Sequence, residues 1–186
     1  SLIAVIFSLI LSLATRKDKK FFLKLITFTA GIGYAIPGSV LAISLITISS
    51  SRFTFISVCL LIWGYVIRFL TISKGSIDSA LERISPTLDE AANGLGSNWL
   101  EIIRRIHLPL LKGPIFVGSL LVFVDTIKEL PISFIYRPLD FDTLSVRIYQ
   151  YADDERIAEA ILPVLIIIIL GLIASITLIP SLEKKN

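Results

Sequence analysis

Residues 160–182 read AILPVLIIIILGLIASITLIPSL and carry no charged side chain. A helix that crosses about 30 Å of hydrocarbon needs about 20 mostly apolar residues, so this stretch is long enough to span a membrane. Four other long runs are also mostly apolar, namely 1–15, 25–51, 53–73 and 113–134. Helices satisfy all backbone hydrogen bonds internally, which a bilayer requires. The sequence therefore predicts an all-α, polytopic membrane helix bundle of about five spans.

The composition of the whole chain agrees with a membrane protein. Of 186 residues, 54% are apolar and 18% are charged, whereas about 25% of the residues of a soluble domain are charged. The net charge of +3 is spread over short clusters between apolar runs, so no basic surface indicates a nucleic-acid partner. The chain starts inside an apolar run and contains no Met, so we expect it to be the downstream part of a longer reading frame.

The sequence contains no set of residues for a reaction of its own. Cys59 is the single cysteine, which excludes an intrachain disulfide and a cysteine metal cluster. There is no phosphate-binding loop of the form G-x-x-x-x-G-K-[ST], and no Ser, His and acid set indicates a hydrolase. We therefore predict that the chain is not an enzyme and has neither a cofactor nor a metal site.

Basic residues give the expected orientation, because Lys and Arg in short loops are retained on the cytoplasmic side. Residues 16–24 contain five of them, whereas residues 49–52 contain one. The loop 16–24 is therefore predicted to be cytoplasmic. Alternation of the spans then places 74–112 and the tail after residue 182 on the same side, and 137–159 on the outside.

The segment 74–112 is longer than a simple turn and carries helix signals. Thr87 and Glu90 have the spacing of a capping box, and Pro86 suits a helix entry, so a short helix is predicted to begin there. Gly94 and Gly96 are expected to end it in a turn with positive φ.

A second helix is predicted to follow, with Asn98 and Glu101 as its capping box. Its apolar positions recur at three and four residues: Leu100, Ile103, Ile106 and Leu110. Pro109 is expected to close this helix where the fourth span begins. Polar side chains beside it are expected to be solvated or to face lipid headgroups: Arg104, Arg105 and His107.

Seven positions of this segment share the spacing of a known motif. Glu90-Ala91-Ala92 is followed after three residues by Gly96, then after nine residues by Ile106, and after one more by Leu108-Pro109. This pattern resembles the EAA motif of ABC importer permeases. The resemblance implies that these residues form a coupling helix and bind a separate, dimeric ATP-binding subunit. The alternative is an interfacial pair of amphipathic helices that only packs under the bundle.

Three other stretches indicate which ABC permeases the chain resembles, namely 33–42 (GYAIPGSVLA), 128–131 (KELP) and 141–147 (FDTLSVR). They look like the downstream half of ferric-iron permeases, and the similarity covers nearly the whole chain. It implies a MetI-like type I permease domain over 1–186, an upstream permease half or second permease subunit, and a periplasmic or extracellular ferric-iron-binding protein. It also implies a multi-pass protein of the bacterial inner membrane that imports ferric iron by alternating access.

Asp125, Lys128 and Glu129 fall in the fourth apolar run. A charge at mid-membrane costs about 2.5–3.5 kcal/mol on insertion scales, so these side chains are expected to face the bundle interior, with Asp125 paired to Lys128. They either line the translocation path, where acid oxygens suit a hard cation such as ferric ion, or form an ion-pair knot between helices.

Pro37-Gly38 predicts a break in the run 25–51, because proline cannot continue a helix. Broken helices in transporters line cavities, so Pro37 and the nearby Tyr34 are candidates for the path. The alternative is a kink that only shapes packing. Arg68 is expected to extend toward the cytoplasmic surface.

Other functions remain compatible with the sequence. An ABC permease for thiamine or another small solute would share the loop motif. An ion-coupled secondary transporter could use Asp125 and Glu129 as proton or cation sites. A membrane scaffold without transport activity is a third possibility.

Overall fold

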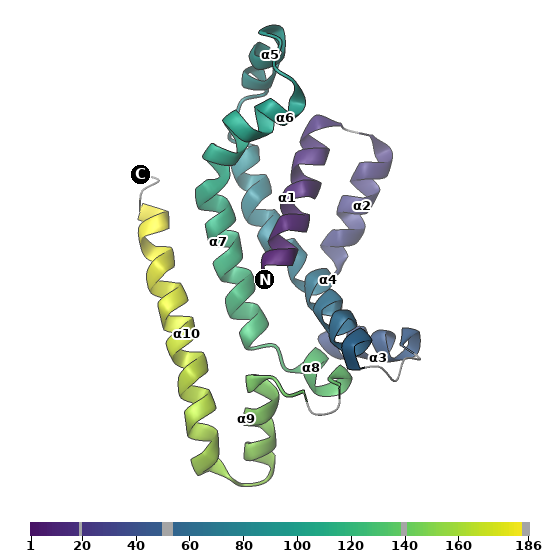
Figure 1. The fold of residues 1–186 in the computed structure, drawn as a ribbon, viewed down its shortest axis with the longest axis vertical. Coiled ribbons are helices and arrows are strands. Elements are labelled where there is room, and N and C mark those ends of the chain that lie inside the picture. The colour runs from purple at the N-terminus through teal and green to yellow at the C-terminus, as the bar shows by residue number, and fades with distance from the viewer. Residues whose placement is uncertain (19, 50–53, 139–140, 184–186) are drawn as a thin grey trace.

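The structure of the chain, a computed structural model, describes residues 1–18, 20–49, 54–138 and 141–183, and every regular element within them is a helix (Figure 1). In chain order these are α1 (Leu2–Lys17), α2 (Phe21–Ile32), α3 (Gly38–Ile48), α4 (Thr54–Leu81), α5 (Pro86–Gly94), α6 (Trp99–Ile102), the π-helix η1 (Ile103–His107), α7 (Leu108–Ile127), α8 (Pro131–Tyr136), α9 (Leu144–Asp153) and α10 (Ile157–Glu183). The predicted all-α class is confirmed. Lys19, Arg52 and the basic tail at 184–186, on which the predicted orientation draws, lie outside the described residues, as does the junction between the runs 25–51 and 53–73.

Three helices among the described residues are long and apolar enough to cross a membrane, namely Ile56–Leu81, Trp99–Ile127 and Ile157–Ile179. They correspond to the last three predicted runs. The first run forms α1, which has 16 residues. The second run is divided into α2 and α3, and the predicted break is confirmed, because α3 begins at Gly38 with Pro37 as its N-cap.

The third and fourth predicted runs have different ends in the structure. α4 continues to Leu81, helped by an ion pair between Lys74 and Asp78, which lie one helical turn apart. α7 ends at Ile127, so Lys128 and Glu129 lie beyond the helix and not within it as predicted. The reason is Pro131, which lacks the N–H that a continuing helix needs and instead begins α8.

Helices α1, α4 and α7 pack together as the core of the bundle (Figure 1). Two buried apolar clusters join these helices, formed by Ala4, Val66, Phe69 and Val122 and by Leu13, Ile77, Leu81 and Leu111. Ser8 and Ser73 join α1 to α4 through hydroxyl oxygens that are 2.7 Å apart. Small residues and hydroxyl hydrogen bonds of this kind are typical of helix contacts in membranes.

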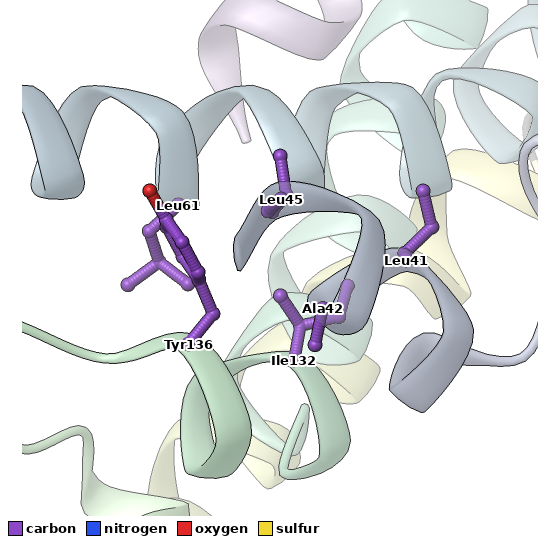
Figure 2. Packing of buried hydrophobic residues seen from close by; sticks show 6 residues of the cluster. All are labelled: Leu41, Ala42, Leu45, Leu61, Ile132 and Tyr136. Carbon is purple, nitrogen blue, oxygen red and sulfur yellow. The ribbon is translucent and has the colours of Figure 1, made fainter. Parts of the chain in front are cut away.

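The two ends of the bundle carry different elements (Figure 1). α5 and α6 lie at one end, while α3, α8 and α9 lie at the other. At this second end, side chains from α3, α4 and α8 form a buried cluster (Figure 2): Leu41, Ala42, Leu45, Leu61, Ile132 and Tyr136. The cluster fixes α3, and with it the break between α2 and α3, against the start of α8.

We expect Gly33→Ala to lower the free energy of unfolding by about 1–3 kcal/mol. A Cβ at Gly33 would lie 2.2 Å from the backbone oxygen of Ile67 in α4, and a packed helix backbone cannot easily move away. The matched control is Gly31→Ala, because a Cβ there meets nothing within 4 Å. Titration of both variants with SDS in detergent micelles, followed by circular dichroism, measures the difference. Equal stabilities would contradict the close approach of α2 to α4.

Candidate functional site

The first helix of the segment between α4 and α7 begins earlier than predicted. α5 starts at Pro86, and the hydroxyl of Ser85 accepts a hydrogen bond from the backbone N–H of Thr87 at 3.3 Å. The predicted capping box of Thr87 and Glu90 is therefore wrong. Proline favours the first helical position because its φ is preset and it has no N–H to satisfy, so the cap falls on the residue before it.

The sequence predicts three features for the segment after α5, namely Gly94 and Gly96 in a turn with positive φ and a capping box at the next helix. The structure confirms Gly96 and the capping box. Gly96 has a φ of +86°, a conformation that L side chains rarely adopt. Gly94, in contrast, is the last residue of α5. The predicted capping box at α6 is confirmed: Asn98 Oδ1 accepts from the N–H of Glu101 at 3.0 Å, and Glu101 Oε2 accepts from the N–H of Asn98 at 2.9 Å.

The second helix does not stop at Pro109. α6, η1 and α7 form one continuous helix, Trp99–Ile127, with Pro109 in the first turn of α7. The π-helical turn η1 ends two residues before this proline and widens the backbone where the ring would otherwise meet the carbonyl of Arg105. The prediction that Pro109 closes the helix is therefore wrong, and α6 is joined directly to the membrane helix α7.

The residues expected to contact an ATP-binding subunit lie in two groups. The first group is on α5 and the turn after it, with Glu90, Ala91 and Gly96 exposed and Ala92 half-buried. The second group spans the end of η1 and the start of α7, with Pro109 exposed and Ile106 and Leu108 half-buried. Asp89 Oδ1 and His107 Nε2 lie 3.1 Å apart, and each is a direct neighbour of one group. The fold therefore brings the two groups together.

Three leucine side chains around these groups are exposed, and Leu95 is more exposed than any other large apolar residue that the structure describes. Leu88, Leu95 and Leu100 are 46%, 88% and 55% exposed. Seven of the nine residues of α5 are exposed, and the other two, Asp89 and Ala92, are half-buried. Exposed apolar patches rimmed by polar residues mark sites of interaction with a protein or a membrane.

A polar cluster that the sequence did not indicate joins α5 to the bundle. We call Arg16, Asp89 and His107 the anchor cluster. Arg16 Nε donates to Asp89 Oδ2 at 2.8 Å, and the other oxygen of Asp89 faces His107. His107 is fully buried, so the expectation that it is solvated is wrong. No sequence signal could reveal this cluster, because Arg16 and Asp89 lie 73 residues apart.

The charged residues near the end of α7 form two separate ion pairs. Lys128 Nζ lies 2.6 Å from Asp125 Oδ1, so the predicted pair is confirmed, but the Lys128 side chain is 64% exposed and does not face the interior. Glu129 is buried and faces Arg68, with 3.9 Å between Glu129 Oε2 and Arg68 Nε. Arg68 also donates to the backbone oxygen of Ile36 at 2.8 Å. Its predicted extension to the cytoplasmic surface is wrong, because this carboxylate and carbonyl hold it inside.

Tyr34 and Pro37 lie in the turn between α2 and α3, and the Tyr34 side chain is 49% exposed. Gly38 follows directly and is packed against the Arg68–Glu129 pair: a Cβ there would lie 2.8 Å from Glu129 Oε1. The break in the chain and the buried ion pair are therefore parts of one contact. Among the described residues, no group of three or more His, Cys, Asp and Glu side chains is placed to hold a metal ion.

Comparisons with known proteins agree with this architecture. A family model described as "Binding-protein-dependent transport system inner membrane component" matches residues 4–185. An Fe(3+)-transport system permease protein of Haemophilus influenzae is 26% identical over 129 residues, which are 68% of this chain and 26% of the relative. A spermidine/putrescine transport system permease protein of the same organism is 26% identical over 154 residues, which are 81% of this chain and 58% of the relative. The chain thus spans less than two thirds of either relative. It belongs to the family of binding-protein-dependent transport system inner membrane components, the permeases of ABC importers.

Proposed function

We propose that the chain is the transmembrane permease component of an ATP-driven importer, and that a separate, dimeric ATP-binding subunit docks on α5 and the turn after it. The family match over residues 4–185 supports the transport role. The observation that carries the docking proposal is that seven of the nine residues of α5 are exposed, while Leu95, directly after it, is 88% exposed. A helix that leaves most of its surface uncovered by its own chain is suited to the groove of a partner.

The proposed contacts with the ATP-binding subunit are the seven motif positions: Glu90, Ala91, Ala92, Gly96, Ile106, Leu108 and Pro109. They lie in the proposed cytoplasmic loop 74–112 of a permease domain that takes up 1–186. ATP is hydrolysed by the partner, and its closure moves α5. Since α6 continues into α7 through one helix, this movement enters the membrane bundle by direct mechanical contact.

The opposite end of the bundle, with α3, α8 and α9, is proposed to face the outside of a bacterial inner membrane and to meet a binding protein. The exposed apolar side chains of α10 are suited to lipid or to an upstream permease half or second permease subunit, with Leu162 at 68% and Ile176 at 62% exposure.

The proposed translocation path includes five residues near this outer end: Tyr34, Pro37, Asp125, Lys128 and Glu129. The half-exposed ring of Tyr34 and the exposed Lys128 are accessible to a cargo. Glu129 is occupied by Arg68 and by the N–H of Ile132, whose nitrogen is 3.0 Å from Glu129 Oε1. The proposed role of Glu129 is therefore to hold the path in shape. In this proposal the charged residues include both residues accessible to cargo and an ion pair that joins helices.

Ferric iron is the proposed cargo, supported by the resemblance of 33–42, 128–131 and 141–147 to ferric-iron permeases and by the Fe(3+)-transport relative. A polyamine is the second candidate, because the other relative is a spermidine/putrescine permease.

Uptake by proteoliposomes that contain the complete transporter tests these proposals. With the binding protein and ATP, we expect radioactive ferric iron to accumulate inside the vesicles, and spermidine not to accumulate. Accumulation of spermidine alone would make the cargo assignment wrong. Accumulation driven by an ion gradient without any ATP-binding subunit would contradict the importer mechanism and favour a secondary transporter.

A further inference from the structure

α5 is attached to the rest of the chain through few side chains. Along its length only Asp89 and Ala92 are half-buried, and they lie three residues apart on one face, while the other residues are exposed. Beneath this face a cavity of about 850 Å³ extends between α1, α2 and α4, with Asp89 and Pro86 in its lining. Apolar packing therefore contributes little to the position of α5, and the polar contacts of Asp89 become its main attachment.

The first contact of Asp89 leads to α1 and α4. Arg16, in the last turn of α1, donates Nε to Asp89 Oδ2 at 2.8 Å, and both side chains are mostly buried, with 13% and 16% exposed. The same guanidinium donates to the backbone oxygens of Leu81 at 2.6 Å and Ile84 at 3.0 Å. Arg16 thus satisfies backbone carbonyls at and just after the end of α4 and at the same time binds α5 through Asp89. Charge-assisted hydrogen bonds of a planar guanidinium fix orientation as well as distance.

The second contact of Asp89 leads to α7. Its Oδ1 lies 3.1 Å from Nε2 of His107, the last residue of the π turn and the one directly before α7. His107 is fully buried, and its ring lies against Trp99, with 5.6 Å between the ring centroids. Lys17 lies over the Trp99 ring at 5.9 Å, which joins the end of α1 to α6. One carboxylate therefore contacts the ends of two core helices.

We propose that the anchor cluster, Arg16, Asp89 and His107, is the positioning set through which movement of α5 reaches α1 and α7. This inference rests on the proposed docking of an ATP-binding subunit on α5. A partner that pulls on α5 pulls on Asp89, and Asp89 moves α1 through Arg16 and α7 through His107 as one body. The continuous helix α6–α7 transmits the movement of α5 to α7 through the backbone. The anchor cluster transmits it to α7 and also to α1 through side-chain contacts.

A distance measurement in the assembled transporter tests the inference without knowledge of the cargo. Spin labels are placed on α5 at Asn93→Cys and on α7 at Leu110→Cys, both exposed, in a Cys59→Ser background. Pulsed electron paramagnetic resonance then compares the nucleotide-free state with the state trapped by ATP and vanadate. We expect one unchanged distance distribution with native Asp89, and a nucleotide-dependent shift or broadening with Asp89→Ala or with Arg16→Gln. The matched control Glu82→Ala removes an exposed carboxylate nearby and is expected to behave as the native chain.

Either of two results would overturn the inference: a nucleotide-dependent shift with native Asp89, or no shift in either cluster variant.

Transport gives a second readout that a purely structural role would not produce. In Asp89→Ala we expect ATP hydrolysis to continue while ferric-iron uptake per ATP hydrolysed falls about tenfold. Parallel loss of both activities would also count against the cluster. Copurification of the ATP-binding subunit with the native chain tests the docking proposal separately, so its failure is distinguishable from failure of the anchor cluster.

Discussion

We expect Arg68→Leu to lower the free energy of unfolding by about 3–5 kcal/mol, the usual cost of leaving one member of a buried ion pair without its partner. Glu129 has a side chain that is 7% exposed, and Arg68 is its ion-pair partner. The substitution also removes the hydrogen bond to the oxygen of Ile36, which holds the break between α2 and α3. SDS titration in micelles measures the loss.

Two controls make this prediction specific. Arg147→Leu removes an arginine of the same length whose side chain is 52% exposed and whose partner Asp142 is 3.4 Å away, so its expected cost is at most about 1 kcal/mol. The double variant Arg68→Leu with Glu129→Gln should recover most of the loss, because the amide oxygen can still accept from the N–H of Ile132 while the buried charge is gone. If Arg68→Leu lowers the free energy of unfolding no more than Arg147→Leu does, the Arg68–Glu129 ion pair does not join these elements as we infer.

The second large effect is expected at the turn between α5 and α6. Gly96→Val should reduce ATP-driven uptake by about tenfold or more while the helical bundle keeps its stability. At a φ of +86° a β-branched residue is strained, and strain of this kind costs about 1–3 kcal/mol, enough to change the direction in which α5 leaves the turn.

Gly94→Val is the matched control, because a Cβ at Gly94 or at Gly96 meets nothing within 4 Å, and only Gly96 has the positive φ. Gly96→Asn should fall between the native chain and Gly96→Val, since Asn tolerates left-handed backbone better than β-branched residues. Uptake and ATP hydrolysis measured on the same vesicles separate lost coupling from lost docking. Equal uptake by the two valine variants would show that the turn geometry does not matter for transport.

Local patterns account for what could be predicted from the sequence. Long uncharged runs indicate membrane helices, and Pro37 marks the break between α2 and α3, since both follow from rules that act within one stretch of chain. The capping box of Asn98 and Glu101 and the positive φ of Gly96 are local in the same sense. The first capping box failed because Pro86 and Ser85 offer a better start within the same turn.

Contacts between distant residues could not be predicted in this way. Arg68 and His107 both lie beside apolar residues, where exposure at a surface is a reasonable default for a polar side chain. Their true surroundings depend on Glu129 and Asp89, which other helices bring near. The spacing of the seven motif positions indicated the importance of the segment, but not the cluster that attaches it to the bundle.

Cross-linking from Leu95 tests the central claim, that an ATP-binding subunit docks on α5 and the turn after it. The variant Leu95→Cys, with Cys59→Ser, carries a photoactivatable reagent at a site that is 88% exposed, and Tyr149→Cys in α9 is the control at the opposite end. In native membrane vesicles we predict an adduct between Leu95→Cys and the ATP-binding subunit, identified by mass spectrometry, and none from Tyr149→Cys. An adduct from Tyr149→Cys instead, or labelling of Leu95→Cys by an impermeant reagent added outside intact cells, would contradict the account.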